Sequence, residues 1–282
     1  MRFATTVREG AAAVGIVRAE QVLPLGLPGA DLGSVRAIAA SGPDALRRVR
    51  DWVDAQPEDA YRPIHEVELG PAVADPGAIY TIGLNYRAPG VLDDAAPERP
   101  LVYGKAPSSV AGHGSVVDWD RSVTANVDAE IELGVVIGDP AWRVEAEDAM
   151  RHVFGYACIN DISSRDPWLD GDQWLIGKSM PGFCPVGPWV VTRDELDPMD
   201  LGLGCRINGL AIQEDRTASM RFAIPDLIAY LSRHVELRPG DLIATGTPAR
   251  LPAPPGPERR LEPGDVVTAW IEGIGELTNS IA

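Results

Sequence analysis

Lysine is scarce in this sequence. Among its 25 basic residues only Lys105 and Lys178 are lysines, and each of them follows a glycine. A chain that uses arginine for nearly all of its positive charge keeps lysine where a compact ammonium on a flexible stem is needed. We therefore treat both lysines as candidate site residues, although a lysine is more often a solvated surface residue.

Cysteines and long apolar runs are scarce as well. The three cysteines, Cys158, Cys184 and Cys205, are odd in number and lack zinc-binding spacing, which favours buried thiols over disulfides or metal ligands. No apolar run reaches the roughly 20 residues of a membrane-spanning helix, and the first residues lack the apolar core of a signal peptide. We therefore expect a cytoplasmic protein without a membrane partner.

Acidic residues outnumber basic ones in this sequence. The chain has 41 acidic residues and a formal net charge of -16, and such a chain repels phosphate backbones. Nucleic acid is therefore excluded as an expected partner. With 282 residues, 45% of them hydrophobic, the chain can bury a full core and needs at most two domains.

The segment 1–70 is predicted to form a small α+β domain. Residues 2–7 and 13–18 are typical of a β-hairpin, and helical patterns follow at 32–40 and 43–55. Proline and glycine then accumulate at Pro71, Pro76 and Gly77, just before the β-rich run 78–84. We place the domain boundary between residues 70 and 71.

The segment 71–282 is predicted to form one larger, mainly β domain. Asn208-Gly209 between two apolar runs indicates a hairpin, and the Pro-Gly-Asp turns at 239–241 and 263–265 each lead into a β-branched run. Two helices are expected, at 146–153 and at 224–234. Short strands with few helices favour an α+β fold with a rolled or folded sheet over a doubly wound one.

Acidic residues alternate with apolar ones in the segment 127–138. Because the side chains of a strand repeat their direction every two residues, Asp128, Glu130 and Glu132 are predicted to share one face. Three carboxylates on one face repel one another unless a cation or exposure to water relieves them. An exposed edge strand is therefore the alternative, but the apolar residues 133–137 are typical of a buried strand.

Asp161 follows a second strand-like run, 155–160, and is expected to approach the first strand from the side. The resulting site would contain only oxygen ligands. Hard cations such as Mg²⁺, Mn²⁺ or Ca²⁺ accept carboxylates and water, whereas zinc prefers histidine and cysteine. Three protein carboxylates would leave coordination positions open for a chelating substrate.

Short motifs follow one another in order from residue 78 to the end of the sequence. They are Ile82-Gly83-Leu84-Asn85-Tyr86, Tyr103-Gly104-Lys105-Ala106-Pro107, Glu130-Ile131-Glu132-Leu133, Asn160-Asp161-Ile162-Ser163-Ser164-Arg165-Asp166, Lys178-Ser179, Pro185-Val186-Gly187-Pro188, Asn208-Gly209 with Gln213, and Thr245-Gly246-Thr247-Pro248. Their type and order resemble the fumarylacetoacetate hydrolase family. The resemblance covers residues 78–282.

The resemblance implies a role for several residues. The implied metal ligands are Glu130, Glu132 and Asp161, and the implied active-site lysine is Lys178. The implied substrate-binding residues are Tyr86, Lys105, Arg165, Gln213 and Thr247. It also implies a mixed β-roll catalytic domain, a homodimer, Mg²⁺ or Mn²⁺ as cofactor, and a 2-oxo or 1,3-dicarbonyl carboxylic acid as substrate. A cation that chelates a 2-oxo carboxylate stabilises the enolate, and a nearby ammonium stabilises the same charge.

The sequence departs from the family at one point. Hydrolytic members follow the Asn-Tyr pair with a histidine and a glutamate that activate water, but this chain has Pro89 and Leu92 there. Proline cannot transfer a proton. His113, which lies between glycines, is the candidate general base, and the weaker candidates are Asp93, Asp94 and Glu98.

Three functions follow from this pattern. The first is a metal-dependent hydrolase or decarboxylase that cleaves a C–C bond of an oxo acid through an enolate. The second is a keto–enol tautomerase or isomerase, which needs no hydrolytic water. The third is a non-catalytic protein that binds a small acid, but retention of the carboxylates and of Lys178 counts against it.

Overall fold

The computed structural model describes residues 1–26, 32–87, 96–166, 173–252 and 260–282. Its helices are α1 (Val35–Ala40), α2 (Gly42–Asp54), α3 (Ala146–Ala149), α5 (Trp174–Lys178) and α6 (Ile224–Ser232), with the 3-10 turns Glu58–Ala60, Ile64–Glu66, Pro107–Ser109, Met150–His152, Pro198–Asp200 and Thr217–Ser219. Its strands are β1 (Arg2–Arg8), β2 (Ala11–Arg18), β3 (Gln21–Pro24), β4 (Arg62–Pro63), β5 (Glu68–Leu69), β6 (Ile79–Gly83), β7 (Leu101–Lys105), β8 (Val110–Ala111), β9 (Val116–Val117), β10 (Val127–Asp128), β11 (Ile131–Ile137), β12 (Val153–Asn160), β13 (Ser163–Ser164), β14 (Cys184–Thr192), β15 (Gly202–Ile207), β16 (Leu210–Arg216), β17 (Leu242–Ala244), β18 (Val266–Ile271) and β19 (Gly275–Ile281).

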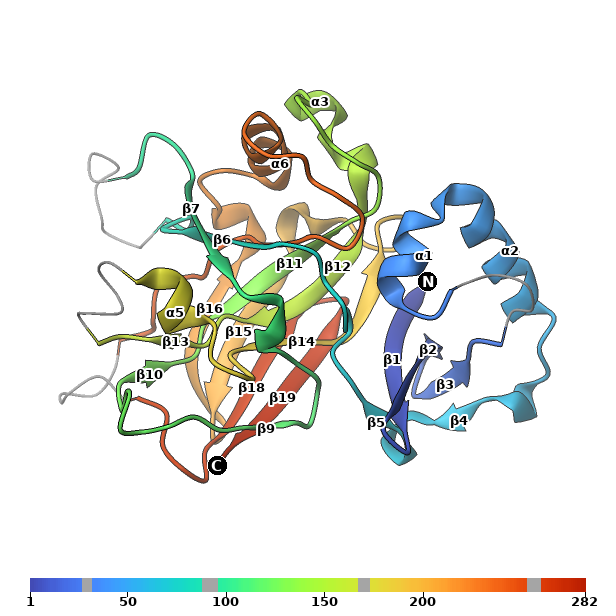
Figure 1. Ribbon diagram of the computed structural model, residues 1–282, viewed down its shortest axis with the longest axis horizontal. Helices are drawn as coiled ribbons and strands as arrows, with labels where there is room; N and C mark the ends of the chain where they lie inside the picture. Colours follow the sequence, from blue (N-terminus) through green and yellow to red (C-terminus); the bar gives the residue numbers. More distant parts are fainter. Residues whose placement is uncertain (27–31, 88–95, 167–172, 253–259) are drawn as a thin grey trace.

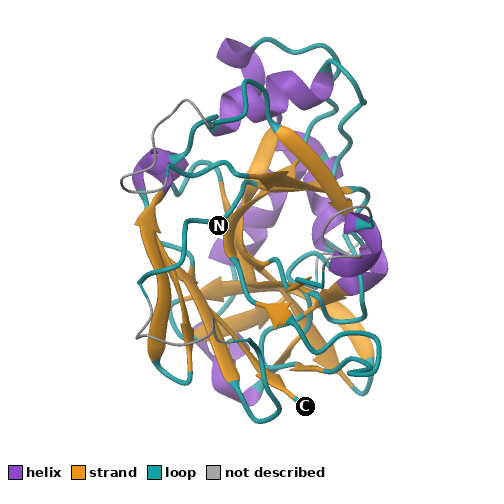
Figure 2. Ribbon diagram, turned by 90° about the vertical axis from the view of Figure 1, so that its left-hand side faces the viewer, coloured by secondary structure: helices purple, strands orange, loops and turns teal. Residues whose placement is uncertain are grey.

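Two sheets pack on each other to form the larger lobe. The longer sheet has the order β4-β3-β2-β1-β14-β12-β11-β17-β6-β7, and the second has the order β16-β15-β18-β19-β9. Strands β17 and β6 run parallel, while β11 is antiparallel to both of its neighbours, so the longer sheet is mixed. Figure 2 shows the strands in the middle of the molecule and the helices mostly around them. The predicted α+β, mainly β class is confirmed.

The core between the two sheets is made of side chains at alternate strand positions. Leu133 and Val135 of β11 lie in the same buried cluster as Leu203 of β15 and Val267 of β18. The opposite face of the longer sheet packs against the N-terminal helices, where Val49 and Val53 of α2 share a cluster with Val136. Strand β11 is therefore buried on both faces, which explains its apolar sequence.

The N-terminal segment forms the predicted hairpin and helices. Strands β1 and β2 pair from Arg2 opposite Val17 to Arg8 opposite Ala11, and the hydroxyl of Ser34 accepts a hydrogen bond from the amide of Ala37 at the start of α1. Figure 1 shows this part, in blue, as a second lobe beside the larger one. Because β1 also pairs with β14, the N-terminal strands extend the longer sheet. The domain boundary at residue 70 stays a prediction.

Local turn chemistry agrees with the predicted hairpin. Asn208 and Gly209 have φ values of 51° and 80°, so both central residues of the turn are left-handed, as a two-residue hairpin requires. The predicted helix at 146–153 is shorter than expected. It ends at Ala149 and continues as a 3-10 turn, because Val153 already begins the buried strand β12.

The prediction for the cysteines is confirmed, since Cys158, Cys184 and Cys205 are all buried free thiols. Burial raises the pKa of each thiol, which makes all three poor nucleophiles. Among the residues that the structure describes, no helix is long and apolar enough to span a membrane.

Candidate active site

The ends of two neighbouring strands bring three carboxylates together. Strands β11 and β12 are antiparallel, with Ile131 opposite Asn160 and Glu132 opposite Ile159. Asp161 follows β12 directly, and its amide donates to the carbonyl of Glu130 at 2.8 Å. Glu130, Glu132 and Asp161 each offer a carboxylate oxygen within 4.8 Å of the others. The expected lateral approach of Asp161 is confirmed.

Asp128 belongs to a different part of the site. Strand β10 ends at Asp128 and pairs with β13, and β11 begins only at Ile131. The predicted continuous strand is therefore interrupted after Asp128. The Asp128 carboxylate contacts the guanidinium groups of Arg165, Arg250 and Arg260. The exposed edge-strand alternative is wrong, because β11 lies between β12 and β17 and Glu132 is only 2% exposed.

Both lysines point at Asp161. The Nζ of Lys105, at the end of β7, donates to Asp161 Oδ1 at 2.5 Å and to the carbonyl of Ile162 at 3.0 Å. The Nζ of Lys178, at the end of α5, donates to Asp161 Oδ2 and to the hydroxyl of Ser163, the latter at 2.7 Å. Both ammonium groups are buried, and each is paired with a carboxylate and hydrogen-bonded, as a buried charge must be.

This pairing fixes the charges of the cluster. Burial alone would raise the pKa of the Asp161 carboxyl, but the ammonium groups of Lys105 and Lys178 lower it to about 2. Burial opposes the charge of Lys178, yet Asp161, Glu130 and Glu132 raise the pKa of this lysine above its usual value. Asp161 is therefore a carboxylate and Lys178 an ammonium at neutral pH.

The Glu132 carboxyl group is buried next to other carboxylates. Burial and the negative charge of Asp161 raise the pKa of Glu132 well above its usual range. Its Oε2 accepts a hydrogen bond from the amide of Gly246 at 2.8 Å. Gly246 has a φ of 101°, and a Cβ there would lie 2.7 Å from the Cβ of Asn85, so glycine is required for this approach.

The three carboxylates fit a hard divalent cation. Their donor set consists of oxygen atoms only, which suits Mg²⁺ or Mn²⁺ and not zinc. A cation among them would also relieve the repulsion that raises the pKa of Glu132.

The carboxylates line one wall of a pocket of about 600 Å³. Gln213 forms another part of the lining, where its Oε1 accepts from the amide of Ile131 at 3.1 Å and its Nε2 donates to the hydroxyl of Thr247 at 2.8 Å. Tyr86 and Arg165 also line the pocket. The structure thus brings Tyr86, Arg165, Gln213 and Thr247 to one pocket with Lys178 and the three carboxylates.

Sequence reasoning missed several residues of this pocket. Arg250 and Arg260 surround Asp128 at one end, and Trp174 stacks on Tyr103 with ring centroids 4.6 Å apart. The sequence could have indicated Trp174, because it stands four residues before Lys178. In a helix this spacing places the two side chains on the same face. The Lys178 Nζ lies 5.9 Å from the centre of the Trp174 ring.

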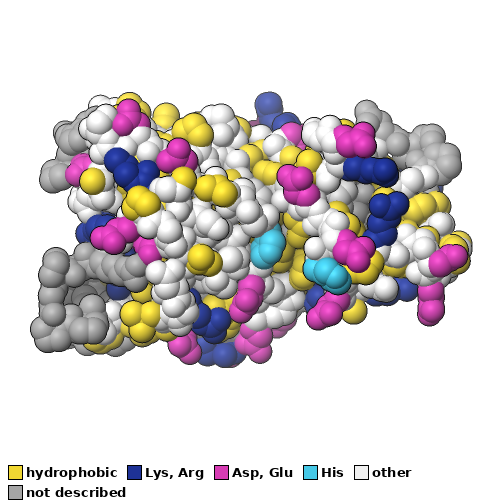
Figure 3. Space-filling model, turned by 90° about the horizontal axis from the view of Figure 1, so that it is seen from below, with side chains coloured by type: hydrophobic (Ala, Val, Ile, Leu, Met, Phe, Trp, Pro, Cys, Tyr) yellow, Lys and Arg dark blue, Asp and Glu magenta, His cyan; other side chains and the backbone are white. Residues whose placement is uncertain are grey.

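Two predicted site residues lie elsewhere. The Lys105 side chain has no exposed surface and sits behind Asp161, so it positions that carboxylate and is not among the residues that line the pocket. His113 lines a different cavity, of about 850 Å³, together with His65 and Glu276, and its Nδ1 accepts from the amide of Thr278 at 3.2 Å. The face of the molecule in Figure 3 shows histidine side chains near acidic ones.

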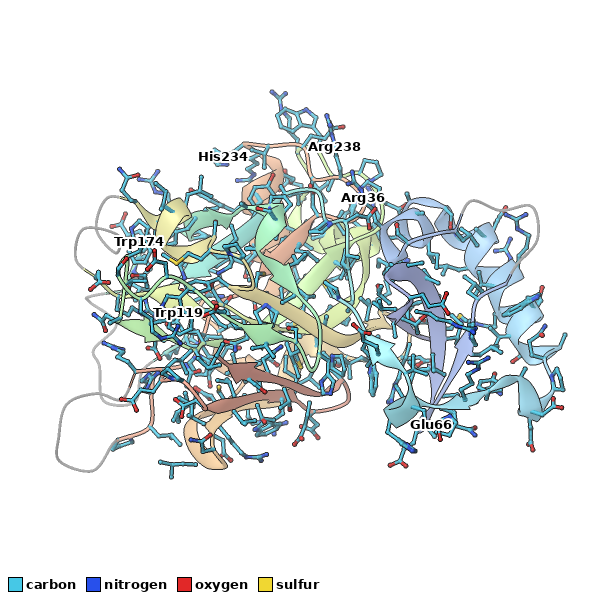
Figure 4. All side chains as sticks on the ribbon, turned by 60° about the horizontal axis from the view of Figure 1, so that its bottom comes forward. Arg36, Glu66, Trp119, Trp174, His234 and Arg238 are labelled. Atoms are coloured by element: carbon cyan, nitrogen blue, oxygen red, sulfur yellow. The ribbon has the colours of Figure 1, made fainter. Side chains whose placement is uncertain are left out.

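The second cavity is formed in part by the N-terminal lobe, since Ile64, His65, Val67, Glu68 and Leu69 line it. In Figure 4, Trp174 marks the end of the molecule that holds the carboxylate pocket, and Glu66 marks the opposite end. Of the weaker general-base candidates, Asp93 and Asp94 lie outside the described residues, and Glu98 is exposed. Pro89 and Leu92, which stand where hydrolytic members carry the water-activating pair, also lie outside the described residues.

The sheets and the site together define an enzyme scaffold that is found in known proteins. The model of the fumarylacetoacetate hydrolase C-terminal family matches residues 78–282. The chain therefore belongs to the fumarylacetoacetate hydrolase family, and the comparisons support an enzyme of this superfamily.

Similar proteins differ in the reaction that they catalyse. The oxaloacetate tautomerase YisK of Bacillus subtilis is 40% identical over 223 residues, which are 77% of this chain and 74% of that protein. A fumarylacetoacetate hydrolase from Exiguobacterium antarcticum superimposes with a TM-score of 0.87 at 31% identity, covering 100% of this chain and 99% of that one. Maleylpyruvate hydrolase from Sphingobium sp. SYK-6, solved with manganese(II) and pyruvate, has a TM-score of 0.81 at 27% identity, with 100% and 99% covered.

Replacing Lys105 with methionine is expected to lower the free energy of unfolding by about 3 kcal/mol, because it leaves the buried Asp161 carboxylate with one ammonium partner fewer. The matched control is Arg47→Met, which breaks an exposed ion pair with Asp44 on α2 and should cause no measurable loss. Urea unfolding of both variants measures the difference. Equal effects of the two substitutions would contradict the structural role of Lys105.

Proposed function

We propose that this protein is a divalent-metal-dependent tautomerase that interconverts the keto and enol forms of a small 2-oxo dicarboxylic acid. The proposal is carried by one observation. A buried ammonium, that of Lys178, lies beside three clustered carboxylates in a pocket whose described lining contains no histidine.

Glu130, Glu132 and Asp161 would hold a Mg²⁺ or Mn²⁺ ion, which would polarise the 2-oxo carbonyl of the substrate. Lys178 supplies a fixed positive charge in the same pocket, because its ammonium is held by Asp161 and Ser163. A preorganised charge in a buried site stabilises the negative charge that develops on the enolate more strongly than water does. The carboxylates and Lys178 thus favour the enolate shared by both tautomers.

Tautomerisation is the reaction of an enolate that needs no further reactant. The C3–H bond breaks and its proton passes to water, its electron pair forms the C2–C3 double bond, the π pair of the carbonyl moves onto the oxygen, and that oxygen takes up a proton from water, so that substrate and product are isomers. No water molecule is consumed. This chemistry agrees with Pro89 and Leu92 at the positions where hydrolytic members of the family carry the water-activating pair. The 40% identity to an oxaloacetate tautomerase supports the same choice.

A group of arginines in the pocket supports a substrate with a second carboxylate. Arg165, Arg250 and Arg260 line the pocket around Asp128, which is 4% exposed. Guanidinium groups match the planar carboxylate geometry and bind it with paired hydrogen bonds. A small 2-oxo acid that carries a second carboxylate would therefore be held through that carboxylate by the arginines as well as through its 2-oxo acid group by the cation.

Cleavage of a C–C bond is the second candidate. The structural similarity to a maleylpyruvate hydrolase solved with manganese and pyruvate favours it, because the same enolate is formed when such a bond breaks. In this chain the cleavage would proceed by decarboxylation or with a water molecule activated by another group. The homodimer and the cytoplasmic location implied by the sequence stay predictions.

The two candidates give different products from one substrate. With Mg²⁺ or Mn²⁺ present, we expect the purified protein to accelerate the keto–enol conversion of oxaloacetate, followed by the ultraviolet absorbance of the enol, without release of pyruvate. Chelation of the metal should abolish the acceleration. Metal-dependent pyruvate formation would instead support the cleavage candidate, and neither activity would contradict both.

Replacing Arg250 with glutamine is expected to raise the KM for oxaloacetate by about tenfold or more, since a charged hydrogen bond is worth about 1.5–3 kcal/mol. Deuterium exchange at C3 of pyruvate, which has one carboxylate, should change by less than about threefold for the same reason. The control is Arg206→Gln, an exposed arginine that pairs with Glu276 outside the pocket. Equal effects on both substrates would contradict the proposed recognition of a second carboxylate.

A further inference from the structure

The second cavity, of about 850 Å³, lies where the N-terminal lobe meets the larger lobe. Glu20, in the turn between β2 and β3, and Glu68 of β5 line it from the N-terminal lobe, while Trp189 of β14 and His113 line it from the larger lobe. No described residue lines both this cavity and the carboxylate pocket. Cavities of this size hold small molecules, and such sites form preferentially at the junction of two domains.

The loop that carries His113 is held firmly in place. The Nδ2 of Asn279 donates to the carbonyl of Gly112 at 2.8 Å, and the amide of Thr278 donates to the imidazole of His113. A Cβ at Gly112 would lie 2.5 Å from the carbonyl carbon of Gly70, so the loop packs directly against the segment 1–70. This part of the cavity wall is therefore formed before any ligand binds, as is usual for ligand sites.

The lining includes a buried donor without a partner. The indole Nε1 of Trp189 is buried, and nothing in the described part of the chain accepts a hydrogen bond from it. Buried polar groups are nearly always paired, because an unpaired one has lost its hydrogen bonds with water and gained none. Since Trp189 lines the cavity and its indole can only donate, a ligand with an acceptor oxygen would complete this hydrogen bond.

The charges in the lining are negative. Glu20, Glu68 and Glu276 line the cavity, and no lysine or arginine is among the described residues that do so. Glu276 forms an ion pair with Arg206 at 3.3 Å, whereas Glu20 and Glu68 have no ion-pair partner in the described part of the chain. Burial lowers the pKa of His113, so this imidazole adds no positive charge at neutral pH. The cavity therefore attracts cations and disfavours anions.

Apolar side chains lie beside these carboxylates. Ile64, Val67, Leu69 and Trp189 line the cavity and are only partly buried, although they pack against a small cluster of buried apolar residues. Covering their remaining apolar surface with a hydrocarbon group is favourable. An apolar surface next to unpaired carboxylates is complementary to a cation that carries a hydrocarbon chain.

We propose that this cavity binds a small organic cation, an alkylammonium that carries a neutral acceptor oxygen such as that of an amide or a hydroxyl group. The ammonium pairs with Glu20 and Glu68, the hydrocarbon part lies on the apolar side chains, and the oxygen accepts from the Trp189 indole. A carboxylate in place of the neutral acceptor would be repelled by the glutamates. The inference does not depend on the proposed tautomerase function, because the ligand is opposite in charge to that substrate and binds elsewhere.

The test uses three probes of similar size. The first, 5-aminopentanamide, has an ammonium and an amide oxygen, whereas pentanamide lacks the ammonium and pentylamine lacks the amide. Titrations followed by ¹H–¹⁵N NMR report the indole N–H groups of the seven tryptophans, and Trp189→Phe identifies the signal of Trp189. We expect 5-aminopentanamide to shift that signal and to bind at least about tenfold more tightly than pentanamide and about twofold more tightly than pentylamine, because each comparison removes one hydrogen-bonding group.

Glutamine substitutions locate the site. Glu20 and Glu68 are exposed, so the double variant Glu20→Gln/Glu68→Gln should fold normally, and it should bind 5-aminopentanamide about tenfold more weakly. The matched control is Glu214→Gln, an exposed glutamate outside the cavity, which should bind as the wild type does. Glu132→Gln should also leave this affinity unchanged, because Glu132 lines the carboxylate pocket.

Four results would overturn the inference. They are equal affinity of the wild type and the double variant, loss of binding only in Glu132→Gln, pentanamide binding as tightly as 5-aminopentanamide, and a Trp189 signal that no probe shifts at millimolar concentration. A Trp189 signal that moves with protein concentration instead would show that a second copy of the chain covers the cavity. None of these results depends on whether the protein has keto–enol activity.

Discussion

The ion pairs of one buried aspartate hold the site together. Asp161 is 1% exposed, and its two carboxylate oxygens accept from two different ammonium groups, those of Lys105 and Lys178. A carboxylate or an ammonium buried alone would be strongly unfavourable, so each of the three side chains depends on the others. These contacts join the end of β12 to the end of β7 and to α5, which are distant in sequence.

The same contacts set the electrostatics of the site. Glu130, Glu132 and Asp161 face two ammonium groups and the guanidinium of Arg165, so acidic and basic side chains are matched in number around the cluster. A divalent cation adds positive charge to this balance, and an anionic substrate offsets it. Under the proposed function, the site would bind a cation together with a dicarboxylate, and it would favour the enolate because that form carries additional negative charge near the cation.

Local patterns in the sequence predicted much of the fold and the acidic part of the site. The period-two alternation identified Glu130 and Glu132, the end of the next strand-like run identified Asp161, and the scarcity of lysine identified both buried ammonium groups. These predictions succeeded because each depends on a short segment or on neighbouring strands. The Asn208-Gly209 hairpin was predictable for the same reason.

Other parts of the site depend on contacts between distant segments. Arg250 and Arg260 reach Asp128 from more than 120 residues away, and in sequence they are ordinary arginines in a chain rich in arginine. The strand is interrupted after Asp128 because β10 pairs with β13. The alternation of acidic and apolar residues does not predict that pairing. Histidine often serves as a base, which makes His113 a candidate in the sequence, but its place in the structure is beside β19, where it accepts from the amide of Thr278.

The most direct test of this account is the binding of Mn²⁺, measured by calorimetry and by the paramagnetic resonance signal of the free ion, for the wild type, Glu132→Gln and Glu145→Gln. Glu132 is buried in the cluster, whereas Glu145 is an exposed carboxylate outside it. The account predicts one Mn²⁺ per chain, unchanged affinity for Glu145→Gln, and a loss of at least about tenfold for Glu132→Gln. No binding to the wild type, or equal affinity of wild type and Glu132→Gln, would contradict it.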